Sequence, residues 1–224
     1  MQISVNGTTM HQVQPKTSFY FALPFWCSLA LIPLVWIAAI WGGVAFVLVF
    51  IATWLLFPFL DLILGLNLEN EDTDKDLNLL FWHKLLLLCW PALQFLTIFG
   101  LIYYSCSYEI SKLESLGLFL SVGAISGIVG INYSHELMHG SKKVDRYLSD
   151  FLLGMVFYSH FRSEHLLVHH KYVGTPRDGV TAKFDESFYQ FFLPELDVCF
   201  QISQYLMSYK KLINIVHQKG NYLV

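Results

Sequence analysis

Six of the nine histidines lie between positions 135 and 170, and five of these six form two groups whose spacing suits metal binding. The first group is His135 and His139 in the stretch SHELMHG, and the second is His165, His169 and His170 in the stretch EHLLVHHKY. Side chains four positions apart lie on one face of a helix, one turn apart, so each such pair of imidazoles can share a metal ion. In an α-helix His170 would point about 100° away from His169, and could address a second metal or a second side of one site.

Zinc and iron are both candidates for the first group. Zinc is a candidate because the group matches the H-E-x-x-H motif of zinc proteases. A zinc protease needs three protein ligands and one open position, with Glu136 as the general base. The second group then supplies more histidines than one zinc ion uses, whereas a pair of first-row transition metals can use them all, and iron is favoured where oxygen is activated. In the iron interpretation Glu136 orients an imidazole by accepting its other N–H. The excess of ligands favours iron, with an intramembrane zinc protease as an alternative.

Histidines can also be buried for structural reasons alone. A single buried histidine is more often a hydrogen-bonded core residue than a ligand, so a membrane protein without enzymatic activity is a further alternative. Five histidines in two groups beside an apolar segment are harder to explain in this way, because ionisable groups at that depth are costly and usually functional. We therefore expect a metal centre.

The composition indicates that membrane helices position these histidines. Hydrophobic residues make up 55% of the chain and charged residues 14%, whereas a soluble domain carries about a quarter charged residues. A bilayer core needs about 20 consecutive apolar residues per helix. The expected fold is an all-α, polytopic membrane helical bundle that forms a single domain over residues 1–224, with a polar tail over residues 1–18. Four spans are predicted, at about 19–40, 44–64, 83–104 and 115–134.

Two further apolar segments are too short or too polar to be full spans. Residues 147–161 are interrupted by Asp150, Gly154 and His160, and residues 188–207 are amphipathic, so both are predicted to form partial or interfacial helices. Positive charge near the span ends places the amino terminus and the histidines on the cytoplasmic side. The basic residues on that side are Lys16, Lys75, Lys84, Lys142, Lys143 and Arg146, against Lys112 on the other.

Net charge and cysteine content argue against two other kinds of function. The formal net charge of −3 provides no basic field to hold nucleic acid. The four cysteines are scattered and form no C-x-x-C motif, which argues against a disulfide framework and against a thiolate metal site. We therefore expect no nucleic-acid partner, and the apolar composition makes membrane lipid the expected surroundings.

Several longer stretches resemble those of one enzyme family. The stretches HELMHG, EHLLVHHKYVGTPRD and FDESFYQFF are similar to those of the integral-membrane non-haem di-iron hydroxylases, and most similar to the alkane 1-monooxygenases. FPFLDLILG (57–65) and FYSHF, before the second histidine group, also resemble this family, so the likeness runs from about residue 55 to 205. The fatty-acid desaturase relatives share the histidine boxes but match less well around GTPRD. A fatty-acyl desaturase or hydroxylase is therefore the alternative within the superfamily.

The resemblance implies roles for individual residues. It implies that all five histidines of the two groups bind iron, with two iron ions in a complete site. Other residues would support the ligands without binding metal, and three aromatic residues could line a substrate channel. The supporting residues are Glu136, Glu164, His160, Asp178 and, with a role at a helix end as the equal alternative, Asp61; the aromatic residues are Trp54, Phe57 and Phe59.

The resemblance also implies an activity. The family reaction would be the hydroxylation, with O2, of the terminal methyl group of a medium- or long-chain alkane. Electrons would come from a rubredoxin-type donor at the cytoplasmic face of a bacterial inner membrane. A long apolar channel would hold the substrate, and position alone would select the end carbon.

The chain departs from the family pattern at four places. Gly140 stands where the family usually has Lys, Val168 where Gly commonly precedes the histidine pair, and Arg177 where an acid is common. The family also carries a third box, H-x-x-H-H, beyond the second, whereas only His217 follows here. Five histidines fill one iron site and begin another. We therefore expect a fragment that is incomplete at its carboxyl end and, alone, inactive or partly metallated.

Overall fold

The computed structural model describes residues 19–64 and 80–195, together with Asp197, Gln201, Gln204, Tyr205 and Ser208. Within these residues every regular element is a helix, which confirms the predicted all-α class. The chain divides into two compact units, Met1–Ile125 and Ser126–Val224. The predicted polar tail lies outside the described residues, and a single domain over 1–224 stays a prediction.

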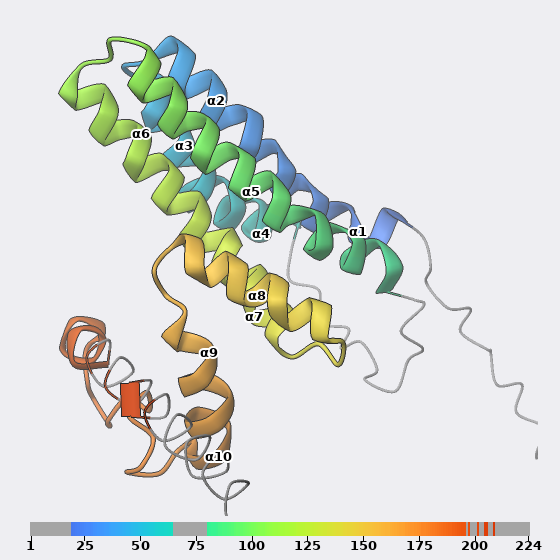
Figure 1. The fold of residues 1–224 in the computed structure, drawn as a ribbon, viewed down its shortest axis with the longest axis vertical. Coiled ribbons are helices and arrows are strands. Elements are labelled where there is room, and N and C mark those ends of the chain that lie inside the picture. Colours follow the sequence, from blue (N-terminus) through green and yellow to red (C-terminus); the bar gives the residue numbers. More distant parts are fainter. Residues whose placement is uncertain are drawn as a thin grey trace, which may run out of the picture. The chain divides into compact units, whose positions relative to one another are not determined.

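Apolar helices that pack side by side form the first unit (Figure 1). Helix α2 contacts α3, α5 and α6. Close approach is possible because Gly100 lies against the Trp36 ring and Gly117 against the Phe46 ring. The elements are α1 (Phe19–Trp26), the 3₁₀ helix η1 (Cys27–Ala30), α2 (Leu31–Trp41), α3 (Ala45–Ile51), the π-helix η2 (Ala52–Leu56), α4 (Phe57–Leu64), α5 (Phe81–Ser107) and α6 (Lys112–Ile125).

Three helical stretches are long and apolar enough to cross a membrane: Ala22–Trp41, Phe81–Ser107 and Lys112–Met138. They correspond to three of the four predicted spans. The predicted span 44–64 is helical from Ala45 onward as α3, η2 and α4. Its apolar helix, Ala45–Leu55, is shorter than the three candidate spans. Its membrane crossing stays a prediction. The chain is an integral membrane protein with at least these three candidate spans.

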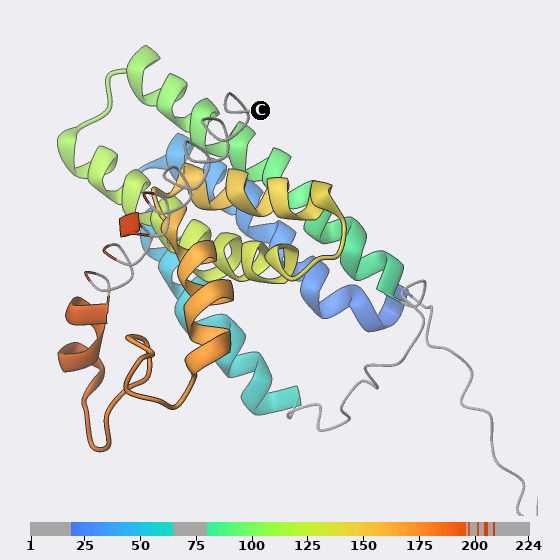
Figure 2. The same cartoon turned by 60° about the horizontal axis from the view of Figure 1, so that its bottom comes forward.

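The turns of the first unit are fixed by local chemistry. Gly42 and Gly43 both have positive φ, at 65° and 52°, and the Glu114 carboxylate lies where a side chain at position 42 would begin. Glu114 also takes part in a capping box with Ser111 at the start of α6, because its carboxylate accepts the Ser111 N–H at 3.0 Å. The Ser111 hydroxyl in turn accepts the Glu114 N–H at 3.2 Å. Helices α5 and α6 form a hairpin (Figure 2), and this capping box fixes where α6 begins.

The second unit contains the histidine groups. Helices α7 and α8 pack together, and the buried hydroxyls of Ser134 and Ser149 lie 2.8 Å apart between them. The predicted partial helix at 147–161 ends earlier than expected, since the chain turns after α8 with Phe157 at φ 57°. Of the predicted helix 188–207, residues 188–195 are helical. The elements are the π-helix η4 (Ser126–Gly130), α7 (Ile131–Met138), α8 (Lys143–Met155), α9 (His160–Glu164), the π-helix η5 (His165–His169) and α10 (His170–Tyr172).

Candidate metal centre

The first histidine group lies at the carboxyl end of α7. His135 is in its last turn and His139 follows directly as the cap residue, so their rings lie one turn apart with centroids separated by 4.8 Å. The helix is held in place one residue before His135, where the Ser134 hydroxyl contacts Ser149 and is wholly buried. The i, i+4 spacing therefore brings the two imidazoles together on an anchored helix end.

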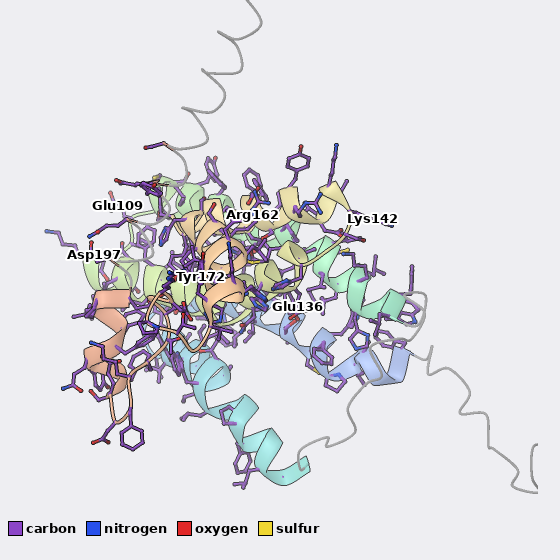
Figure 3. All side chains as sticks on the ribbon, turned by 90° about the horizontal axis from the view of Figure 1, so that it is seen from below. Glu109, Glu136, Lys142, Arg162, Tyr172 and Asp197 are labelled. Carbon is purple, nitrogen blue, oxygen red and sulfur yellow. The ribbon has the colours of Figure 1, made fainter. Side chains whose placement is uncertain are left out.

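The second group lies on a single helical stretch that changes its winding. Residues His165–His169 are π-helical, and the N–H of His170 donates to the carbonyl oxygen of His165, five positions earlier. Upstream, Arg162, which is labelled in Figure 3, forms a 2.6 Å ion pair with Asp150 of α8. The ion pair ties α9 to α8, and so ties the start of the second group to the helix that packs on α7.

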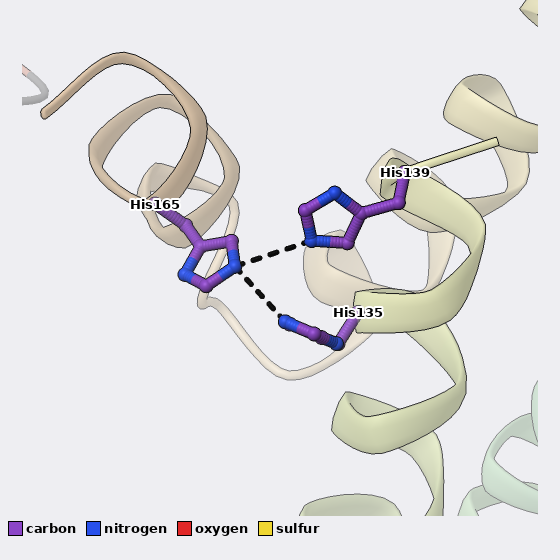
Figure 4. A group of neighbouring side chains, drawn as sticks. All are labelled: His135, His139 and His165. Atoms are coloured by element: carbon purple, nitrogen blue, oxygen red, sulfur yellow. Dashed lines mark hydrogen bonds between the residues drawn. The ribbon is translucent and has the colours of Figure 1, made fainter. Parts of the chain in front are cut away.

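Four imidazole nitrogens converge in the second unit. His165 Nε2 lies 2.9 Å from His135 Nε2, 3.3 Å from His139 Nε2 and 3.0 Å from His170 Nε2. Figure 4 shows His165 facing the two histidines of α7. The group of His135, His139 and His165 has the arrangement of a metal site, with one ligand atom from each residue within 4.8 Å of the others.

Hydrogen bonds alone cannot account for four imidazole nitrogens at these separations. A ring nitrogen carries either one lone pair or one N–H, so His165 Nε2 cannot bond fully with three neighbouring nitrogens. A cation among them would accept all four lone pairs. Metal–nitrogen bonds of about 2.1 Å place adjacent ligand nitrogens roughly 3.0 to 3.4 Å apart, close to the separations found here. The residues therefore fit a transition metal ion.

The electrostatics of the cluster favour neutral, metal-binding imidazoles. Burial, together with the neighbouring His135, His170, His139 and His169, lowers the pKa of His165 to about 4. Burial also lowers the pKa of His139, with smaller contributions from His135 and His170. A neutral imidazole offers the lone pair that a metal needs. At neutral pH these two rings are therefore neutral and could bind a metal ion.

His169 is held apart from this convergence by a carboxylate. Its Nδ1 lies 2.9 Å from Oδ2 of Asp178, whose side chain is fully buried. The same carboxylate accepts the Thr181 hydroxyl at 2.5 Å and the Val180 N–H at 3.2 Å. Burial alone would raise the pKa of Asp178, but these hydrogen bonds and His169 lower it, so the group is ionised. A donor bond from Nδ1–H leaves His169 Nε2 as the nitrogen with a free lone pair.

The remaining predicted residues of the second unit differ in their exposure and in their contacts. Glu136 is 65% exposed, and its carboxylate is 3.5 Å from Nδ1 of His135, longer than an ordinary hydrogen bond. Glu164 is buried beside His165. His160 is half-buried with its ring 4.6 Å from that of Tyr158, and burial lowers its pKa.

Four predicted residues belong to the first unit. Trp54 and Phe59 are 61% and 56% exposed, in η2 and α4. The side chains of Phe57 and Asp61 lie outside the described residues, although their backbone is part of α4. A channel lined by these aromatic residues, and a role for Asp61 at the site, stay predictions.

One residue of the site was missed from the sequence. Thr181 donates to Asp178 and also accepts the Gly174 N–H at 3.0 Å, so its hydroxyl closes the loop that holds His169. The available signal was its position three residues after Asp178, a spacing at which hydroxyl and carboxylate side chains often bond locally.

Comparisons with known proteins point in the same direction as this geometry. The family model of the fatty acid desaturases matches residues 114–219, which include both histidine groups. An alkane 1-monooxygenase of Pseudomonas putida is 27% identical over 201 residues, 88% of this chain and 50% of that protein. Alkane 1-monooxygenase 1 of Alcanivorax borkumensis is 32% identical over 165 residues, 73% of this chain and 40% of that protein. Over these residues the chain is similar to the alkane 1-monooxygenases.

This similarity to alkane 1-monooxygenases confirms the resemblance carried by the histidine motifs. A third relative, alkane 1-monooxygenase 1 of Pseudomonas aeruginosa, is 33% identical over 138 residues, 60% of this chain and 36% of that protein. The chain thus spans half or less of the length of these three relatives.

Two departures from the family pattern have a local explanation in this structure. A Cβ atom at Gly140 would lie 2.6 Å from Cβ of Asp145 and 2.5 Å from its Oδ2, so the turn between α7 and α8 has no room for Lys. Arg177 places its guanidinium 5.7 Å from the centre of the Tyr172 ring, a contact that an acidic residue would not make. Val168 is half-buried within η5, and nothing in the structure explains its replacement of Gly.

Proposed function

We propose that this chain acts as a membrane non-haem iron monooxygenase that hydroxylates the terminal methyl group of medium- or long-chain alkanes. The observation that carries the proposal is the convergence of three Nε2 atoms on that of His165, at 2.9 to 3.3 Å. The names of the curated relatives support alkanes as the substrate class.

The proposed role of each histidine follows from its contacts. His135, His139, His165 and His170 would hold an iron ion through Nε2. His169, oriented by Asp178, would present Nε2 to a second iron, and a complete centre would contain two. The bound iron would supply the activation of O2 for hydroxylation. Burial lowers the pKa of His165 and of His139, which keeps these two rings available as ligands. Supporting roles for Glu136, Glu164, His160 and Asp178 belong to the proposal.

The membrane setting supports an apolar substrate. The three candidate spans carry many large apolar side chains that are exposed in the structure, among them Phe99 at 52% and Phe119 at 55%. Such residues suit contact with lipid or with an alkyl chain. Placement of the histidines at the cytoplasmic side of a bacterial inner membrane, and a rubredoxin-type electron donor there, belong to the proposal.

Product analysis tests the proposal. The protein is produced from its whole coding sequence, purified in detergent, loaded with Fe²⁺ and supplied with O2, rubredoxin, its reductase, NADH and n-octane, with a fatty-acyl substrate in a parallel reaction. Formation of 1-octanol that requires iron and is lost in His165→Ala is the expected result. Conversion of the fatty-acyl substrate alone would favour the desaturase alternative. Retention of zinc instead of iron, with peptide hydrolysis lost in Glu136→Gln and kept in His170→Ala, would favour the protease.

A further inference from the structure

The step from His165 to His170 contains one residue more than a regular helix would use to align two ligands. In an α-helix, residues five apart lie about 140° apart around the axis, so their side chains cannot reach the same ion. The two Nε2 atoms are nevertheless 3.0 Å apart. The reason is the wider π-helical turn, in which the His170 N–H bonds to the His165 carbonyl oxygen.

We propose that the π-helical turn of η5 sets which histidines share the metal ion, and we call this turn the register device of the centre. Its sequence, H-x-x-x-H-H, contains one residue more than an α-helix would need, and the π-turn takes up that residue. Without that residue the sequence would be H-x-x-H-H on a regular α-helix. Around the axis of that helix, one histidine of the pair would lie about 60° to one side of the first histidine, and the other about 40° to the opposite side. The inference rests on the metal centre of the proposed function and adds how the second group reaches it.

Both ends of η5 are fixed, which explains why the extra residue is absorbed between them. On the upstream side, Arg162 is paired with Asp150 at 2.6 Å and Glu164 is buried. On the downstream side, His169 is bonded to the buried Asp178 at 2.9 Å. An added residue between fixed ends can widen one turn or rotate one end, and here the turn is widened.

Leu167 is the residue of this turn whose removal disturbs least. It is 46% exposed, whereas Leu166 and Val168 are half-buried. Deletion of Leu167 therefore shortens the turn to α-helical register without opening a buried cavity. Insertion of one alanine after Leu167 is the matched control, because the turn then contains a second extra residue and the histidine pair must rotate away. Leu167→Ala controls for the leucine side chain itself.

The test measures Co²⁺ binding by the full chain in detergent, followed by the visible absorption of the bound ion. The wild type is measured first: no binding by the wild type would count against the proposed function itself. Given wild-type binding, we expect the Leu167 deletion and Leu167→Ala to keep the dissociation constant within about tenfold, and the insertion to weaken binding by about 100-fold or more. A deletion that weakens binding as strongly as the insertion, or an insertion without effect, would overturn the register device.

A second comparison decides the question if the deletion variant does not fold, as judged by its elution and helical circular dichroism. In the π-helical register His170, not His169, shares the ion with His165. His170→Ala is therefore expected to weaken Co²⁺ binding more than His169→Ala does. Neither side chain is fully buried, so both variants are expected to fold. The reverse order of affinities would show an α-helical register and overturn the inference.

Discussion

His169 and Asp178 form a hydrogen bond at 2.9 Å across nine positions, and the carboxylate that accepts it is fully buried. The bond fixes the proton of His169 on Nδ1 and directs Nε2 away from the loop. The orientation of His169 is therefore set by a residue of the following loop and not by its own helix. Its availability to a metal therefore depends on the loop that carries Asp178.

Asp178→Ala is expected to change the tautomer of His169. Without the buried acceptor, Nδ1–H loses its partner, and the metal-free chain should lose about 1–3 kcal/mol of unfolding free energy. Nitrogen-15 NMR of histidine-labelled protein reports which ring nitrogen carries the proton, with His169→Ala as the assignment standard. Asp185→Asn, at an exposed position later in the chain, is the matched control. An unchanged His169 signal in Asp178→Ala would contradict the pairing.

Thr181→Val is expected to loosen the loop between Gly174 and Thr181. The substitution removes a donor to Asp178 and the acceptor of the Gly174 N–H, each worth about 1 kcal/mol. Limited trypsin digestion at Arg177 and Lys183 should become several-fold faster, because cleavage follows local opening. Thr181→Ser keeps the hydroxyl and should be cut at the wild-type rate. Equal rates for the valine and serine variants would show that the hydroxyl does not close the loop.

Gly140→Ala is expected to destabilise the turn that joins α7 to α8. The new Cβ would lie 2.6 Å from Cβ of Asp145, which is not the mobile end of a side chain, so the turn must shift. Overpacking of this kind costs about 1–3 kcal/mol. The variant should unfold at a lower temperature and bind Co²⁺ more weakly, because His139 directly precedes the turn. Gly127→Ala, where a Cβ meets nothing within 4 Å, is the control, and equal losses in both variants would contradict the steric explanation.

The first histidine group could be predicted from sequence because its geometry is local. Four positions along an ordinary helix place His135 beside His139, and the rings lie 4.8 Å apart. The same rule placed His165 with His169, whereas the structure places His165 Nε2 beside His170 Nε2. Helical periodicity assumes uniform winding, and the π-turn that breaks it depends on how both flanks of η5 are held, which spacing along the chain does not encode.

Span prediction shows the same division between local and tertiary information. The apolar run predicted at 83–104 is confirmed within Phe81–Ser107, because hydropathy alone marks it. The apolar run at 44–64 is interrupted in its helical winding by η2, where residues 52–56 are π-helical, and no sequence signal predicted that change. Thr181 was missed for a related reason, since its role appears only when the loop folds back on His169.

The metal content of the purified chain tests the central claim most directly. Wild type, His165→Ala and His83→Gln are purified from iron-replete cells without chelators, and iron and zinc are measured per chain by mass spectrometry. His83 lies on α5 in the first unit, so it controls for the loss of a histidine as such. We predict iron in the wild type and in His83→Gln, and the loss of most of it in His165→Ala. Equal iron in all three proteins, or zinc in place of iron in the wild type, would contradict the account.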